Sequence, residues 1–425
     1  VTEPAGAGSV TDTVTAAPAA TGSADPPRLV RALVVDPRFG PFFWGSLVSN
    51  TGTWLQSMSA VLLIFELTGS ATAVGGVTVA QYGGYVLLAP IAGQLADRFE
   101  RRRLLIVMQS VGLLGAVWLV VVVADDSYGI LPIYAGVAVT GCAQALSVPL
   151  IHALVPSLVP RADLPGAVAL QSLTYNFSRA VGPALGAGTL VAAGPVVTFG
   201  ANAGSYVAML IGLLCTRPRT RPALRRTAAT ASVVRYLREH WPVAARLLMV
   251  GAVGFAIDAV NVLSAPVAHA LGVGDASVGV LVSAFGIGGA VMIVLAVSVI
   301  RRIGDGPATV VGFGVLAAAL VVFGNVPSFP VVVVGLVLGG AGFVLGQTAL
   351  TTSIQRAVPE AVRGRVLALW AVLFLGIRPL AAVVDGGLAD LVGVGGAVLV
   401  PVALLVAGLV VVSTRRAALT ARAAG

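Results

Sequence analysis

The chain has 425 residues, of which 57% are hydrophobic and only 10% are charged. Soluble domains typically carry about 25% charged residues, so this composition excludes a water-soluble fold and is typical of a membrane protein. A spanning helix uses about 20 residues, and the apolar content is sufficient for twelve of them. The net charge of +9 comes from arginine alone, without a compact basic module that contains aromatic residues, so we expect no nucleic-acid partner.

Catalytic and cofactor-binding motifs are absent from the sequence. The two cysteines, Cys142 and Cys215, lie in apolar segments, which excludes a disulfide framework and a cysteine zinc site. There is no H-E-x-x-H, G-x-S-x-G or Walker A motif, and the glycines at 312–317 begin a membrane helix without a preceding strand. We therefore predict that the protein is not an enzyme and that it binds no metal and no cofactor.

Apolar segments of spanning length follow one another in two groups of six. The first group lies at 42–67, 74–96, 104–124, 130–155, 166–192 and 195–215. The second group lies at 243–269, 278–300, 308–323, 329–354, 366–388 and 395–412. The predicted divisions are a disordered cytoplasmic tail at 1–38, an N-terminal half at 39–216, a cytoplasmic linker at 217–242, a C-terminal half at 243–414 and a cytoplasmic tail at 415–425.

The distribution of arginine predicts the orientation, because loops that stay in the cytoplasm retain an excess of basic residues. Twenty-four of the 26 arginines lie in alternate loops or in the two tails, whereas the opposite loops contain none. Both termini and the linker are therefore expected on the cytoplasmic side of the inner (plasma) membrane. The mixture of arginine and apolar residues at 232–246 predicts an amphipathic helix on the inner leaflet.

The two halves share a weak internal repeat. An ungapped shift of 199 residues places Arg179 on Arg378 and Gly188 on Gly387. The shift pairs the fifth span with the eleventh, as duplicated six-helix halves require. Chance matching of small apolar residues explains part of the repeat, but a matched arginine inside the membrane is harder to obtain by chance.

The loop after the second span contains the most specific motif of the sequence. The residues that form it are Gly93, Asp97, Arg98, Arg101 and Arg102. Their spacing resembles G-x-x-x-D-R-x-G-R-R, the loop signature of the major facilitator superfamily. An aspartate in this loop can face a helix N-terminus and arginines can pair with helix C-termini, so the resemblance implies a latch for one transport state. The alternative is a basic loop that serves topology only.

Further stretches are similar to the branch of the superfamily that includes enterobactin exporters and macrolide efflux proteins. They lie at 49–55, 65–71, 97–103 and 358–366. The resemblance implies an all-α polytopic membrane protein with twelve transmembrane helices in two related halves. It also implies a secondary exporter of drugs, macrolides, siderophores or other secondary metabolites, with the proton gradient as energy source. The second-half counterpart of the loop signature, at 301–305, is degraded, so the latch is expected to be asymmetric.

A second motif lies in the fifth span. Gly182, Pro183 and Gly186 resemble the core of the antiporter motif of the superfamily, and the neighbouring glycine positions are occupied by other small residues. Small residues allow helices to approach closely, and a proline releases the carbonyl group four residues earlier. The motif therefore predicts a tightly packed helix that can bend; ordinary close packing without a role in transport is the alternative.

Three charged residues, Arg179, Asp258 and Arg378, lie deep in the fifth, seventh and eleventh spans. An isolated charge at the centre of a bilayer costs about 2.5 to 3.5 kcal/mol, and transport sites lie near the midplane between repeats. We therefore expect Asp258 to bind the proton, and the arginines to hold polar or anionic groups of the substrate or Asp258 itself. A purely structural ion pair is the alternative. Asp385, seven residues after Arg378, is expected either to extend the polar path outward or to lie at a helix interface.

Uncharged polar and aromatic residues at similar depth complete the predicted pathway. The polar residues are Asn50, Gln56, Gln144, Asn176, Asn261 and Gln347. Each can bind substrate or form a hydrogen bond between helices. Trp54 and Tyr175 are expected either to stack on a flat substrate or to pack without a role in binding.

The expected partners are a small-molecule substrate and the lipid bilayer, and we expect a monomer. A lysophospholipid flippase or a solute importer built on the same scaffold are the functional alternatives. Transport assays with energised inverted vesicles distinguish these alternatives, because an exporter should accumulate substrate inside such vesicles and an importer should not.

Overall fold

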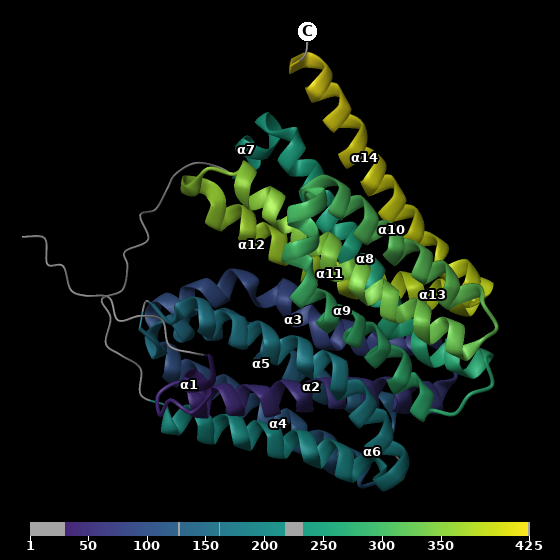
Figure 1. Ribbon diagram of the computed structural model, residues 1–425. Coiled ribbons are helices and arrows are strands. Elements are labelled where there is room, and N and C mark those ends of the chain that lie inside the picture. The colour runs from purple at the N-terminus through teal and green to yellow at the C-terminus, as the bar shows by residue number, and fades with distance from the viewer. Residues whose placement is uncertain (1–29, 126–127, 161, 217–232, 424–425) are drawn as a thin grey trace, which may run out of the picture.

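The computed structural model describes residues 30–125, 128–160, 162–216 and 233–423, which form helices and no strand (Figure 1). The first six helices are α1 (Val30–Val34), α2 (Gly40–Thr68), α3 (Ala71–Arg98), α4 (Arg101–Val123), α5 (Ile130–Leu158) and α6 (Leu164–Cys215). The remaining helices are α7 (Val233–Glu239), α8 (Trp241–Ala270), α9 (Ala276–Ile303), α10 (Asp305–Asn325), α11 (Phe329–Ala357), α12 (Glu360–Gly376), α13 (Arg378–Ala397) and α14 (Leu399–Ala423).

Two of these helices contain a sharp bend at a glycine. Gly194 in α6 and Gly393 in α13 both have a φ of +78°, a conformation that glycine adopts without steric cost. The chain reverses its direction at Gly194. The reversal is evident from the distance of 3.4 Å between Thr198 Oγ1 and Thr189 Oγ1, which would be much farther apart in a straight helix. The 52 residues of α6 therefore form two spans rather than one.

The helices accommodate the predicted number of spans. Among the described residues, eight helical segments are long and apolar enough to cross a membrane; one of them, Val362–Ala397, joins α12 and α13. Leu399–Ser413 in α14 is a shorter apolar segment. The bend in α6 adds one span, and α2 and α3 have 29 and 28 residues. The prediction of an all-helical polytopic membrane protein is confirmed.

The helices form two groups, α2 to α6 and α8 to α14, which occupy the lower and upper parts of Figure 1. In the first group α2 packs along α6, and α4 packs on α5. In the second group α9, α10 and α11 pack together, and α8 contacts α13 and α14. We call the end of the molecule at which α6 ends and α8 begins the linker end, and the opposite one the distal end.

Small residues bring the two groups into backbone contact, with α6 against α9 and α3 against α13. A Cβ atom added to Gly286 of α9 would lie 2.6 Å from the Cα atom of Ala180 in α6. A Cβ atom added to Gly386 of α13 would lie 2.5 Å from the carbonyl oxygen of Ala71 in α3. Such close approach is possible only because a side chain is missing on one helix of each pair.

Two predicted boundaries differ from the structure. The N-terminal tail predicted at 1–38 ends too late, because Leu33 of α1 is 1% exposed and packs into an apolar cluster with Phe39 and Phe42. The amphipathic helix predicted at 232–246 is only the short α7, since Trp241 already begins α8. Residues 1–29 and 217–232 of the predicted tail and linker lie outside the described residues.

Candidate functional site

An ion pair between two spans lies deep in the C-terminal half. The Nη2 and Nε atoms of Arg378 donate hydrogen bonds to Oδ1 of Asp258 at 2.7 and 3.0 Å. Asp258 in α8 is 0% exposed and Arg378 is 6% exposed. Arg378 begins α13 directly after a break at Ile377, because Pro379 has no N–H group to continue the ladder of hydrogen bonds from α12. Arg378 was expected to hold either polar groups of the substrate or Asp258, and in the structure it contacts Asp258.

The other predicted arginine, Arg179 of α6, has aromatic rather than acidic neighbours. Its guanidinium carbon lies 5.0 Å from the ring centre of Phe285, 5.3 Å from that of Phe343 and 5.8 Å from that of Trp54. Arg179 is only 9% exposed, and it makes no hydrogen bond or ion pair with any residue that the structure describes. Contacts with ring faces stabilise a buried cation, but they leave its N–H donors without acceptors.

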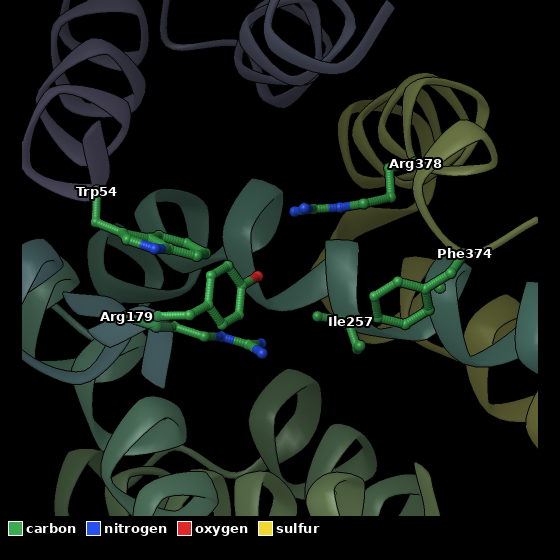
Figure 2. Close-up of a pocket in the computed structure, with 7 residues that line it drawn as sticks. Trp54, Arg179, Ile257, Phe374 and Arg378 are labelled. Carbon is green, nitrogen blue, oxygen red and sulfur yellow. The ribbon is translucent and has the colours of Figure 1, made fainter. Parts of the chain in front are cut away.

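A small cavity separates the two arginines. Its lining consists of Trp54, Tyr175, Arg179, Gly254, Ile257, Phe374 and Arg378. In Figure 2 the side chains of Arg179 and Arg378 extend into this space from opposite sides. Residues of both halves form the wall, so the cavity lies at the place where a transporter of duplicated halves binds its substrate.

Asp385 lies in α13, seven residues after Arg378. Its side chain is 0% exposed, and neither of its carboxyl oxygens has a hydrogen-bond partner among the described residues. The Oδ2 atom of Asp258 makes no well-formed hydrogen bond there, although Thr78 and Asn261 lie beside this carboxyl group. The two carboxyl groups are close enough to interact electrostatically. A buried carboxylate without a partner costs free energy unless it binds a proton, so these are the groups of the site that can exchange protons.

The antiporter-like motif packs α6 between α2 and α9. A Cβ atom added to Gly186 would lie 2.5 Å from the carbonyl oxygen of Leu55 in α2. On the other side of the helix, the backbone N–H of Ala184 donates to Ser283 Oγ of α9 at 3.0 Å. Gly182 likewise faces α2, and Pro183 lies on the side of α9. The motif thus lies at the interface of the two halves, one turn from Arg179.

The loop between α3 and α4 is attached to other helices of the N-terminal half. Arg101 Nη1 donates to the carbonyl oxygen of Ala153 at 3.2 Å. Arg102 donates through Nε and Nη2 to the carbonyl oxygens of Leu213 and Leu214, both at 2.9 Å, at the negative end of the α6 dipole. Gly93, Asp97 and Arg98 lie in α3, but their surroundings fall outside what the structure describes.

The predicted uncharged residues contribute little to the cavity. The side-chain amides of Asn50, Asn176 and Asn261 donate to carbonyl oxygens of their own helices. Gln144 is half-buried in α5, and both polar atoms of Gln347 in α11 are buried without a partner among the described residues. None of these five is among the residues that line the cavity.

Several residues of the site could not be selected from the sequence. Trp54 and Tyr175, which were expected either to stack on a substrate or to pack, line the cavity, whereas Phe285, Phe343 and Phe374 were not singled out. The only signal was the presence of aromatic residues within predicted spans, which is common in membrane helices. Gln56, which was expected to bind substrate or to bridge helices, forms a bridge within the N-terminal half: Asn202 donates to Gln56, and Gln56 donates to Thr140.

Comparisons with known proteins agree with this architecture. A family model described as transmembrane secretion effector matches residues 35–423. The enterobactin exporter EntS of Citrobacter koseri is 26% identical over 375 residues, which cover 87% of this chain and 88% of that protein. Among solved structures, a mutant of the nucleoside transporter NupG matches with a TM-score of 0.70 and 12% identity over 89% of this chain and 98% of that one. A bacterial homologue of ferroportin in an inward-facing state matches with a TM-score of 0.67 and 17% identity over 88% and 97%.

Proposed function

The chain belongs to the transmembrane secretion effector family of the major facilitator superfamily, and on this premise we propose that it exports a small molecule by alternating access. The observation that carries the proposal is the cavity between the two halves, into which the unpaired Arg179 extends. An arginine that is buried without an acidic partner is costly unless it serves a ligand. The relatives named as enterobactin exporters support outward transport of a siderophore, macrolide, drug or other secondary metabolite.

In this proposal the linker end faces the cytoplasm. The arginines at that end, such as Arg101, Arg102 and Arg356, support this orientation under the positive-inside rule. At the distal end the halves are in contact through Asp390 with Ser70, and through the ring of Phe65 with that of His269 at 6.0 Å. With the linker end inside the cell, these contacts close the outer side of the protein.

We further propose that proton entry drives export through Asp258 and Asp385. The support is their burial together with carboxyl oxygens that make no well-formed hydrogen bond among the described residues. A proton on Asp258 would weaken its ion pair with Arg378, because the attraction requires a carboxylate. Protonation can therefore change the contact between α8 and α13, which are helices of the cavity wall.

Transport by inverted membrane vesicles tests the export proposal. The vesicles are prepared from cells that express the chain and from cells that do not, and are energised with lactate in the presence of a metabolite extract. An exporter accumulates one or more compounds inside energised vesicles, and a protonophore releases them. An importer instead accumulates compounds in right-side-out vesicles, and a flippase moves a fluorescent lysophospholipid between leaflets; either result in place of accumulation contradicts export.

The proton proposal is tested with Asp385→Asn and Asp258→Asn in the same vesicles. An imposed pH gradient is expected to stimulate accumulation by wild-type protein and to have little effect in either variant. Asp275→Asn is the matched control, since Asp275 is exposed in the loop before α9. Equal stimulation of wild type and both variants would show that neither carboxyl group binds the transported proton.

A further inference from the structure

The charges that face the cavity do not cancel. Arg378 is neutralised by Asp258, which accepts both of its hydrogen bonds through one oxygen. Arg179 has no acidic neighbour among the described residues, and Asp258 and Asp385 are the acidic side chains buried in the spans around it. The cavity wall therefore presents one uncompensated positive charge, located at Arg179.

The surface around this charge is aromatic. The rings of Phe285, Phe343 and Phe374 follow one another with centroids 5.9 and 6.3 Å apart and interplanar angles of 28° and 9°. They come from α9, α11 and α12, so the series crosses the C-terminal half. On the opposite side, Trp54 of α2 and Tyr175 of α6 lie with their ring centroids 6.2 Å apart. Arg179 is thus held between aromatic residues of both halves.

The combination of one buried arginine with aromatic rings favours particular ligands. A guanidinium group pairs with carboxylate or another planar oxyanion through two parallel hydrogen bonds. Flat aromatic compounds gain offset-stacked or edge-to-face contacts with the rings that line the cavity, which belong to Trp54, Tyr175 and Phe374. A cationic ligand would be repelled by Arg179, and a neutral one would form hydrogen bonds with the guanidinium that are weaker than those of an anion.

We propose that the cavity binds planar aromatic compounds that carry a single negative charge, with Arg179 as the residue that pairs with this charge. The inference rests on the proposed function, because it names the chemical class of the exported substrate. Export of such an anion is also favoured by a membrane potential that is negative inside. Exchange of the anion for an entering proton moves both charges in the direction favoured by that potential.

Binding to the purified full chain in detergent tests the proposal with three compounds of the same shape. The compounds are 2-naphthoate, its neutral amide 2-naphthamide and the saturated anion decahydro-2-naphthoate, and isothermal titration calorimetry measures their dissociation constants. We expect 2-naphthoate to bind at least tenfold more tightly than either of the others. Equal affinities for the three, or no saturable binding of 2-naphthoate, would overturn the proposal.

Substitutions test which residues cause the preference for a negative charge and which cause the preference for an aromatic ring. Arg179→Gln is expected to weaken 2-naphthoate at least tenfold and to change 2-naphthamide less than twofold. Phe374→Leu, which removes a ring of the cavity wall, is expected to reduce the preference for 2-naphthoate over its saturated analogue. Arg238→Gln, in the exposed part of α7, is the matched control and is expected to bind like wild type.

The folding of each variant is checked by size-exclusion chromatography and circular dichroism. If Arg179→Gln does not fold, Arg179→Lys replaces it, because lysine retains the charge but cannot form two parallel hydrogen bonds, and 2-naphthoate is then expected to bind several-fold more weakly. An unchanged ratio of 2-naphthoate to 2-naphthamide affinity in the folded variant contradicts the proposal. Binding selectivity without a gradient is independent of transport direction, so loss of selectivity and failure of export are distinguishable results.

Discussion

The Oδ1 atom of Asp390 lies 2.8 Å from the backbone nitrogen of Ala71, although the two residues belong to different halves. Asp390 Oδ2 also accepts hydrogen bonds from Ser70 Oγ and from the backbone N–H of Thr72, at 2.7 and 2.9 Å. The carboxylate of α13 therefore caps the N-terminus of α3, where the helix dipole favours a negative charge. Separation of the halves at the distal end requires that this cap be lost.

Asp390→Ala is expected to favour opening of the distal end. Loss of an N-cap costs about 1 kcal/mol, so the population of the open state should rise about fivefold. The measurement uses a chain without its native cysteines and with Thr78→Cys, a position of α3 that is 5% exposed. A membrane-impermeant maleimide added outside the cell should label this cysteine about five times faster in the variant.

Asp275→Ala serves as the control for Asp390→Ala. Asp275 precedes α9 at the same end of the molecule, but its side chain makes no capping hydrogen bond. The control substitution should leave the rate of maleimide labelling at Thr78→Cys unchanged. A labelling rate in Asp390→Ala that equals or falls below that of the parent would show that the cap does not hold the distal end closed.

Substitutions of Asp258 and of Arg378 are expected to have strongly non-additive effects on the stability of the protein. Removing one partner of a buried pair leaves an uncompensated charge and typically costs about 3 to 5 kcal/mol. Asp258→Asn and Arg378→Gln should therefore each lower the thermal denaturation midpoint in detergent. The double variant should be more stable than the sum of the two single effects predicts, because neither charge remains. Additive effects would mean that the two side chains do not stabilise one another.

Gly286→Ala is expected to disturb the interface between α6 and α9. The added Cβ atom would meet the backbone of Ala180 at 2.6 Å and that of Arg179 at 2.7 Å, and overpacking of this kind typically costs about 1 to 3 kcal/mol. The thermal midpoint should fall and vesicle transport should decrease. Gly314→Ala in α10, where nothing lies within 4 Å of the added atom, should behave like wild type. Normal stability of Gly286→Ala would show that the helices can separate there without cost.

Arg102→Lys tests the attachment of the loop between α3 and α4. The arginine binds two successive carbonyl oxygens through Nε and Nη2, whereas a lysine presents a single ammonium group on a flexible stem. Stability should decrease by about 1 kcal/mol for the lost hydrogen bond, measured as a lower midpoint in thermal denaturation. Arg103→Lys is the control, because Arg103 is exposed and forms an ion pair with the neighbouring, exposed Glu100. Equal midpoints for the two variants would contradict an anchoring role of Arg102.

The sequence by itself determined the spans, their division into two halves and the family. Long apolar segments are visible because the bilayer requires about 20 apolar residues from each helix. The buried charges were visible for a related reason, since Arg179, Asp258 and Arg378 stand out in segments that otherwise lack charge. The family followed from the short signature of the loop at 93–104, which depends on residue spacing alone.

Only the tertiary structure decided how these residues are paired. Arg179 and Arg378 are equivalent in the repeat, yet Arg378 binds Asp258 across 120 positions of sequence, while Arg179 lies among aromatic rings. The same holds for Asp390, whose partners are about 320 positions away. In a membrane helix the apolar residues surround the axis, because lipid is as apolar as the protein interior. The sequence of such a helix therefore does not indicate which face meets a neighbour, and the packing of the two halves makes that choice.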